Sequence, residues 1–202
     1  MLLFFIGQLE IRQSVTLNHK VVRYSLAFLV IASASVAWEA NMGPEIVELK
    51  EFTVVGIEAR TNNSKEMTGA GIIPKQWDKF FKENIPAEIP DKVDSNIVVV
   101  YSNYQSDNSG DYDYLIGAKV SDASVIPAGM VAKRVPAGKY VPFTTALGPV
   151  GKVVSEKWRE ILDLEGKSRL GGTRAYKADF EIYDQRSRDP QNSQVDVYIG
   201  LK

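Results

Sequence analysis

The sequence predicts an α+β fold built from two similar halves, and three observations support this prediction. Segments of residues 42–118 recur, in the same order, in residues 130–202. Each half contains one stretch in which large apolar residues follow one another at i, i+3 and i+4, the spacing of an amphipathic helix. Apolar runs bounded by turn-forming residues flank each of these stretches, as expected of strands. We therefore expect two pseudo-symmetric βαββ modules packed around a central ligand cleft, because ligand sites often lie at such interfaces.

Each half opens on an extended stretch. In the first half it is IVELKEFTVVGIEA, residues 46–59, and in the second half it is MVAKRVPAGKYVPFTT, residues 130–145. Both are rich in β-branched and aromatic residues, which favour strands. The segment 119–129, KVSDASVIPAG, separates the halves and has the composition of a linker.

One helix is predicted in each half. In PKQWDKFFKEN, residues 74–84, Trp77 is followed three and four positions later by phenylalanines. In VSEKWREILDL, residues 154–164, Trp158 is followed at the same spacing by isoleucine and leucine. Aromatic residues at helical spacing are more typical of a core than of a ligand site, so the core is the first expectation for both tryptophans.

Two strands close each half as a hairpin. IVVVYSNYQ (97–105) and YDYLIGAKV (112–120) flank the turn SDNSGD, while DFEIYDQRS (179–187) and VDVYIGLK (195–202) flank SRDPQNS. Glycine, proline, asparagine and serine in the connecting segments favour turns. Because the two hairpins align with each other, they support an internal repeat.

The acidic residue Glu181 lies in the first strand of the second hairpin. Apolar and polar residues alternate around it, which is typical of a half-buried strand with Glu181 on the solvent side. The repeat indicates the opposite. With Tyr101 aligned to Tyr183, Glu181 falls on Val99, inside an unbroken apolar run typical of a strand buried on both faces. An ionised carboxylate there is unfavourable without a partner, and the residues alone leave both interpretations open.

The composition argues against several classes of function. The chain has 202 residues, a net charge of −1 and a pI near 5.9, whereas nucleic-acid-binding surfaces usually show a basic excess. It contains no cysteine and a single histidine, His19. Disulfides, cysteine nucleophiles, histidine-based triads and multi-histidine metal sites are therefore not expected. We predict no metal, no cofactor, no direct nucleic-acid binding and no membrane partner.

The first 41 residues are predicted to lie outside the fold, which leaves residues 42–202 as the domain. Residues 20–37, KVVRYSLAFLVIASASVA, have the layout of a secretory signal and are too short for a comfortable membrane span. Alternatively, Met42 is the functional start, and residues 1–41 are translated upstream sequence. We expect a cytoplasmic protein in the second case and an exported one if residues 20–37 act as a signal.

From residue 42 to residue 202 the chain resembles the GyrI-like effector-binding domains. These are the drug-sensing halves of some AraC- and MerR-type regulators, and also stand-alone proteins, including members on integron gene cassettes. The resemblance rests on the order and spacing of EIVELKEFTVVGIEA, the Pro-x-Gly-x-Tyr of RVPAGKYVPFTTALGPVG, the helix around Trp158 and the aromatic-Glu-x-Tyr of FEIY. Nothing similar to the regulators' DNA-binding domain precedes Met42, so transcriptional control by this chain alone is not expected.

The resemblance implies two βαββ modules around a cleft for small, often cationic and aromatic molecules. It also implies that the glutamate of the FEIY strand, here Glu181, neutralises the charge of the ligand. Aromatic residues complete the expected ligand-binding set: Tyr183, Tyr140, Tyr114, Tyr112, Trp77 and Phe143. For Tyr140 a pocket role and a structural role both stay open, since a buried tyrosine hydroxyl needs a partner in either case.

Three functions follow from these expectations. The preferred one is binding of small cationic, amphiphilic or aromatic molecules without turnover, by a monomer or a homodimer. The alternative is hydrolysis of reactive small molecules, with Glu181 as general base and a tyrosine as general acid. The third is inhibition of another protein by docking. We prefer binding because nothing in the sequence supplies an oxyanion hole or a metal.

Overall fold

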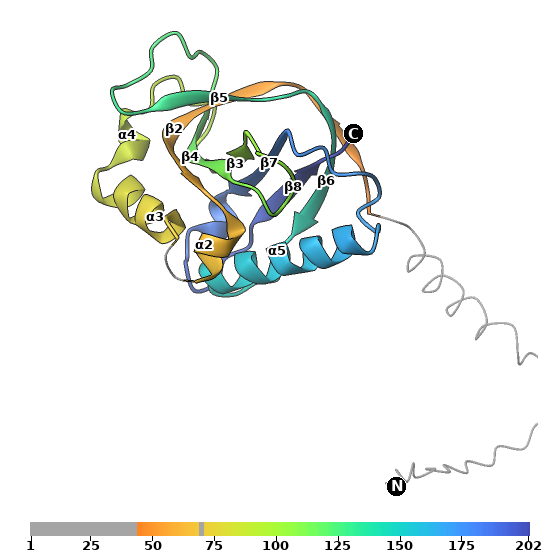
Figure 1. Cartoon of the computed structure of the whole chain (residues 1–202). Coiled ribbons are helices and arrows are strands. Elements are labelled where there is room, and N and C mark those ends of the chain that lie inside the picture. The colour runs from red at the N-terminus through yellow and green to blue at the C-terminus, as the bar shows by residue number, and fades with distance from the viewer. Residues whose placement is uncertain (1–43, 69–70) are drawn as a thin grey trace, which may run out of the picture. The chain divides into compact units, whose positions relative to one another are not determined.

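The computed structural model describes residues 44–68 and 71–202, so the expectations about residues 1–41 lie outside the described residues. The dominant element is a curled sheet of eight strands in the order β1-β6-β8-β7-β3-β4-β2-β5 (Figure 1). Every pair of neighbouring strands is antiparallel. A few helices pack on this sheet, and the predicted α+β class is confirmed.

The elements follow the chain in the order strand, helix, strand in each half. The first half contains β1 (Val47–Leu49), β2 (Phe52–Thr61), α2 (Asn63–Met67), α3 (Ile73–Lys82), α4 (Ile85–Glu88), β3 (Ile97–Ser102) and β4 (Tyr112–Val120). The second half contains β5 (Val131–Val135), β6 (Gly138–Thr144), α5 (Val150–Gly166), β7 (Ala178–Tyr183), the 3-10 turn η1 (Gln185–Ser187) and β8 (Asp196–Gly200).

The structure adds elements that periodicity did not predict. Each extended stretch contains two strands instead of one, and Pro136 lies at the break between β5 and β6. Proline has no backbone N–H to donate to a strand ladder, which accounts for a break there. The helices α2 and α4 have five and four residues. Segments this short have too few positions to show a helical period.

The strands of the two halves form one continuous sheet. At its centre β3 pairs with β7, and Val99 lies opposite Glu181. β1 of the first half pairs with β6 of the second, and β5 of the second half pairs with β2 of the first. Each half therefore extends the sheet of the other with its own first strand. Periodicity could not predict this exchange, because it does not specify which strands pair.

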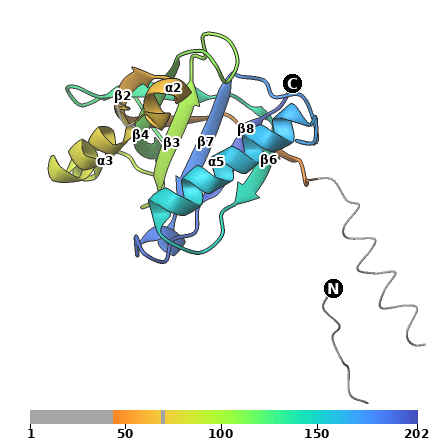
Figure 2. The same cartoon turned by 60° about the horizontal axis from the view of Figure 1, so that its bottom comes forward.

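The two faces of the sheet carry different cores. Alternate residues of a strand share a face, so Phe180 and Ile182 of β7 lie on one side and Glu181 and Tyr183 lie on the other. Phe180 and Ile182 belong to an apolar cluster on the face that bears Tyr140. The opposite face is covered by helices, and α5 lies across β7 and β8 (Figure 2). The helix-covered face is the one that holds the candidate site.

Two glycines allow a close backbone approach where β2 pairs with β4. Gly56 and Gly117 lie opposite each other in the register. A Cβ on Gly117 would overlap the carbonyl of Val55, and one on Gly56 would overlap the carbonyl of Ile116. The backbones are therefore too close at this point for any larger residue.

Within residues 44–68 and 71–202, no helix combines the length and the apolar character that crossing a lipid bilayer requires.

Candidate ligand-binding site

A cavity of about 860 Å³ lies on the helix-covered face of the sheet. Its walls come from α2, α3 and α5 and from strands β3, β4 and β7, so both halves contribute to it. The aromatic side chains of its lining are Trp77, Phe81, Tyr101, Tyr104, Tyr112, Tyr114, Trp158 and Tyr183. Its volume and its aromatic walls suit a drug-sized ligand.

The carboxylate of Glu181 lies in this cavity and is held by three neutral donors. Its residue is 1% exposed. The Tyr101 hydroxyl donates to Oε1 at 2.8 Å, and the Trp158 Nε1 donates to the same oxygen at 2.5 Å. The Tyr183 hydroxyl donates to Oε2 at 2.8 Å. The donors come from β3, α5 and β7, so three elements fix the position of one carboxylate.

Strand pairing and aromatic packing place these donors. Tyr101 lies two residues after Val99, the partner of Glu181, and therefore shares its face of the sheet. The Tyr101 and Trp158 ring centres are 4.8 Å apart, which packs α5 against β3. On the other side the rings of Trp77 and Tyr183 meet edge to face at 4.9 Å, a favourable aromatic geometry.

The charge of Glu181 is not balanced by any cationic side chain of residues 44–68 and 71–202. Within the part of the chain that the structure describes, it makes no ion pair, and its three partners are uncharged. Burial raises the pKa of Glu181, while the hydrogen bonds from Trp158, Tyr183 and Tyr101 lower it in part. Burial and the nearby Glu181 charge also raise the pKa values of Tyr101 and Tyr183, so both phenols stay protonated donors at neutral pH.

A second buried carboxylate, Asp179, lies two residues away on the same face of β7 and does have a cation. Arg174 donates to its Oδ2 from Nε at 3.1 Å and from Nη2 at 2.7 Å. The Tyr104 hydroxyl donates to the same oxygen at 2.6 Å. Arg174 and Tyr104 both line the cavity. Asp179 therefore lies behind the lining residues Arg174 and Tyr104, whereas Glu181 itself lines the cavity, as does the less buried Glu66 of α2.

Two further polar contacts fix the aromatic wall formed by β4. The Trp77 Nε1 donates to the Tyr114 hydroxyl at 3.0 Å, which ties α3 to the strand. The Tyr112 hydroxyl donates to Asn63 of α2 at 3.2 Å. Burial is the main reason why the pKa of each phenol lies above its usual value, so both remain neutral.

The structure brings five of the residues expected at the site together in the cavity lining: Glu181, Tyr183, Tyr114, Tyr112 and Trp77. Sequence reasoning missed Tyr101 and Trp158, which hold the carboxylate, and also Tyr104 and Arg174. The helical spacing of Trp158 predicts a core position, and the residue does pack on core residues while it lines the cavity and its Nε1 donates to Glu181. Tyr101 shares a face with the position aligned to Glu181, a signal that could have identified it.

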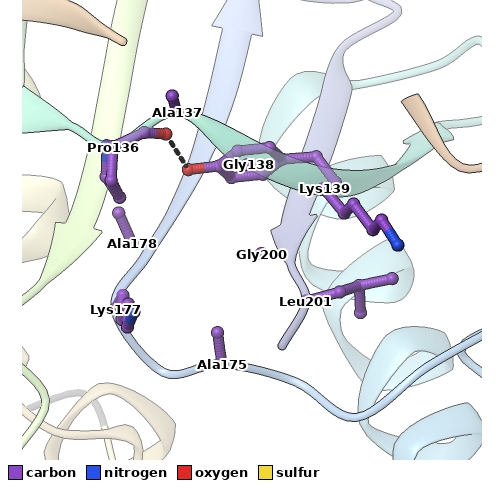
Figure 3. Close-up of a pocket in the computed structure, with 10 residues that line it drawn as sticks. Pro136, Ala137, Gly138, Lys139, Ala175, Lys177, Ala178, Gly200 and Leu201 are labelled. Atoms are coloured by element: carbon purple, nitrogen blue, oxygen red, sulfur yellow. Dashed lines mark hydrogen bonds between the residues drawn. The ribbon is translucent and has the colours of Figure 1, made fainter. Parts of the chain in front are cut away.

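The sequence predicts Tyr140 and Phe143 in the cleft, but in the structure neither residue lines the cavity. Tyr140 lies on the opposite face of the sheet and packs with Phe180. Its hydroxyl donates to the Pro136 carbonyl at 2.8 Å, beside a separate hollow of about 70 Å³ (Figure 3). Phe143 lies against the core cluster around Ile161 of α5 and does not line the cavity. The face of a strand depends on its register, which the Pro-x-Gly-x-Tyr pattern alone does not specify.

Comparisons with known proteins place the chain among effector-binding proteins. A family model described as Cass2, integron-associated effector binding protein, matches residues 45–201. YobU of Bacillus subtilis (strain 168) is 34% identical over 157 residues, which are 77% of this chain and 94% of YobU. The transcriptional regulator BrlR of Pseudomonas aeruginosa is 33% identical over 165 residues, 80% of this chain but only 56% of BrlR.

Two solved structures share the fold. The integron cassette protein VCH_CASS2 from the mobile metagenome of Vibrio cholerae is 30% identical, with a TM-score of 0.62 and coverage of 80% of this chain and 97% of that chain. SAV2435 bound to tetraphenylphosphonium is 18% identical, with a TM-score of 0.65 and coverage of 80% of this chain and 94% of that chain. At 18% identity the second likeness concerns the fold alone.

Proposed function

The chain belongs to the Cass2 family of integron-associated effector-binding proteins, in agreement with the resemblance drawn from its sequence, and from this premise we propose that it binds small cationic aromatic molecules in the cavity around Glu181. The ligand is held there without turnover. Glu181 supplies the counter-charge, and Tyr183, Tyr114, Tyr112 and Trp77 supply contact area together with Tyr101 and Trp158.

One observation carries this proposal: a buried carboxylate faces an aromatic cavity, with three neutral donors and, among the residues that the structure describes, no cation partner. Burying an ionised carboxylate without a counter-charge is unfavourable, because protein groups replace its hydration only in part. A ligand cation supplies the missing charge at the moment of binding. Each well-placed aromatic ring adds a cation–π contact of roughly 0.5–2 kcal/mol.

We propose further that the two halves are copies of one βαββ unit, and that the cavity lies near their pseudo-two-fold axis. The strand order supports this, since β3 and β7 are central neighbours and β4 and β8 follow on either side. The alignment of Val99 with Glu181 is also supported by their direct pairing across β3 and β7. Because the position aligned to Glu181 is the apolar Val99, the site has no symmetric second copy of this carboxylate, which favours one cation instead of two.

The charge of Glu181 is tested by Glu181→Gln, which keeps the shape and removes the charge. Methyltriphenylphosphonium is a suitable cation, and triphenylphosphine oxide is a neutral molecule of similar shape. We expect calorimetry to show a loss of about 1–3 kcal/mol for the cation, the range of a charge-assisted contact, and a much smaller loss for the neutral molecule. Glu156→Gln, an exposed change on α5, is the matched control and should alter neither affinity.

Other outcomes of the same titrations would contradict the proposal. An equal loss for both molecules would mean that the substitution damaged the cavity, and no loss for either would remove Glu181 from the site. The raised pKa of Glu181 and its contact with the Tyr183 hydroxyl are also what an acid–base pair for hydrolysis would need. Turnover of a reactive ester or epoxide that Glu181→Gln abolishes, with ligand affinity unchanged, would establish that alternative.

A further inference from the structure

Strand β7 presents two buried carboxylates on one face, and they differ in one respect. Asp179 is 0% exposed and Glu181 is 1% exposed. Arg174 forms an ion pair with Asp179, whereas no ion pair reaches Glu181 in the described part of the chain. Of these two neighbouring acids, Asp179 is therefore neutralised by a cation and Glu181 is not.

Arg174 lies close to the ligand site. It lines the cavity, and its Cζ is 5.6 Å from the centre of the Trp158 ring. The Nε1 of the same ring donates to Glu181. The indole of Trp158 therefore contacts both the guanidinium and the unpaired carboxylate. An uncompensated guanidinium at this place would repel a ligand cation and would itself act as the counter-charge of Glu181.

Asp179 binds this guanidinium and is itself fixed by further hydrogen bonds. Its Oδ2 accepts from two nitrogens of Arg174 and from the Tyr104 hydroxyl, and its Oδ1 accepts from the Gly200 N–H at 2.9 Å. Glu165 accepts from Nη1 at 3.1 Å, but its side chain is 19% exposed, and charges near solvent are screened more strongly. Asp179 is therefore the main neutralising partner.

Stability does not account for such a cluster. Buried ion pairs are often no more stabilising than apolar residues of the same volume. We propose that Asp179 is a specificity-determining residue: it neutralises Arg174, so that the buried charge facing a ligand is the negative charge of Glu181, with Glu66 of α2 adding to it, and the cavity selects cations. This inference rests on the proposed function, because it explains the selectivity of that same site.

The expected result of Asp179→Asn follows from the charges. Arg174 keeps only Glu165, and the wall of the cavity becomes more positive by one charge. A unit charge in a partly desolvated wall changes the binding of a cation by on the order of tenfold. We expect methyltriphenylphosphonium to bind about tenfold more weakly and triphenylphosphine oxide to bind within about twofold of its original affinity.

Removing the guanidinium as well should reverse the effect. In Asp179→Asn combined with Arg174→Met, no buried positive charge remains in the wall, and affinity for the cation should return to within about threefold of the original value. Asp163→Asn is the matched control, since this aspartate lies on α5 with its side chain 58% exposed and pairs with Lys167. It should change neither affinity.

A second variant keeps the test decisive if Asp179→Asn does not fold. Glu165→Gln removes the more exposed partner of Arg174, and we expect a loss in the same direction but only about twofold to threefold, again confined to the cation. Circular dichroism establishes that each variant is folded before its affinities are measured.

The outcomes separate this inference from the proposed function. Suppose that the original protein prefers the cation and needs Glu181 for this preference. If Asp179→Asn and Glu165→Gln then weaken the binding of the cation and of the neutral molecule equally, or weaken neither, Asp179 has only a structural role and the inference is overturned. Failure of the double variant to recover cation binding would also overturn it. If the original protein shows no preference for the cation and Glu181→Gln changes nothing, the proposed function itself fails.

Discussion

The three donors around Glu181 are chemically alike in one way: none can give up its proton near neutral pH. Burial and the Glu181 charge raise the pKa values of Tyr101 and Tyr183, and an indole N–H does not titrate in this range. The carboxylate therefore has a fixed set of hydrogen bonds, and the variable that remains is its own proton. A cation and a proton thus compete for the same site.

This competition gives the pH dependence a definite sign. Burial raises the pKa of Glu181 above its ordinary value near 4.5, so the folded protein binds this proton more tightly than the unfolded chain does. The loss of folding stability caused by the ionised Glu181 is absent below the ordinary pKa, grows as pH rises from the ordinary to the raised pKa and is complete above the raised pKa. The thermal unfolding midpoint of Glu181→Gln should therefore exceed that of the original protein by an amount that grows as pH rises through this window. Identical pH profiles for the two proteins would contradict the expectation.

Trp158→Phe isolates the contribution of one donor. The ring is largely kept, but the hydrogen bond to the ionised carboxylate is lost. We expect the pH below which a cation ceases to bind to move upward by about one unit, since about 1.4 kcal/mol corresponds to one pKa unit. Trp77→Phe is the matched control, because its Nε1 donates to the Tyr114 hydroxyl and not to Glu181. An equal shift in both variants would indicate a general effect of losing an indole.

At the scale of elements, periodicity predicts which segments form helices and strands, whereas the face on which a strand residue lies depends on register. The helices α3 and α5 and the hairpins of β3–β4 and β7–β8 follow from spacing, turns and the repeat. The sequence leaves the burial of Glu181 open: its alignment with Val99 indicates the buried position that the structure has, whereas the alternation around it indicates the solvent side. The face of Tyr140 did not follow, because a shift of one residue in register reverses the face. The donors Tyr101 and Trp158 depend on how β3 and α5 meet β7, which is tertiary information.

The close approach of β2 and β4 predicts a strong effect of a single methyl group. Gly117→Ala places a Cβ against the carbonyl of Val55, so the strands must separate. We expect a loss of about 1–3 kcal/mol in the free energy of unfolding, measured by denaturant titration. Gly166→Ala at the end of α5 is the control: a Cβ there meets nothing within 4 Å, and we expect a neutral or slightly stabilising effect. Equal stabilities of the two variants would show that the strands relax without strain.

At the scale of the whole molecule, the family match and the cavity both lie within residues 45–201. We therefore predict that the fragment 42–202 folds and binds ligand without residues 1–41. Its circular dichroism spectrum, thermal midpoint and affinity for methyltriphenylphosphonium should match those of the full chain. An insoluble fragment beside a stable, monodisperse full chain would mean that residues 1–41 contribute to the structure.

The exchange of β1 and β5 between the halves also bears on how fast a ligand can reach the cavity. Because β1 pairs with β6, β5 pairs with β2 and β3 pairs with β7, the halves cannot swing apart without breaking three strand pairs. Exposed residues of the cavity lining come from α2, α3 and α5: Met67 and Phe81 are 86% and 60% exposed, and Arg159 is exposed as well, so the cavity opens at these helices. We therefore expect the association rate to depend on movements of these helices, while the sheet keeps Glu181 in place for ligands of different shape.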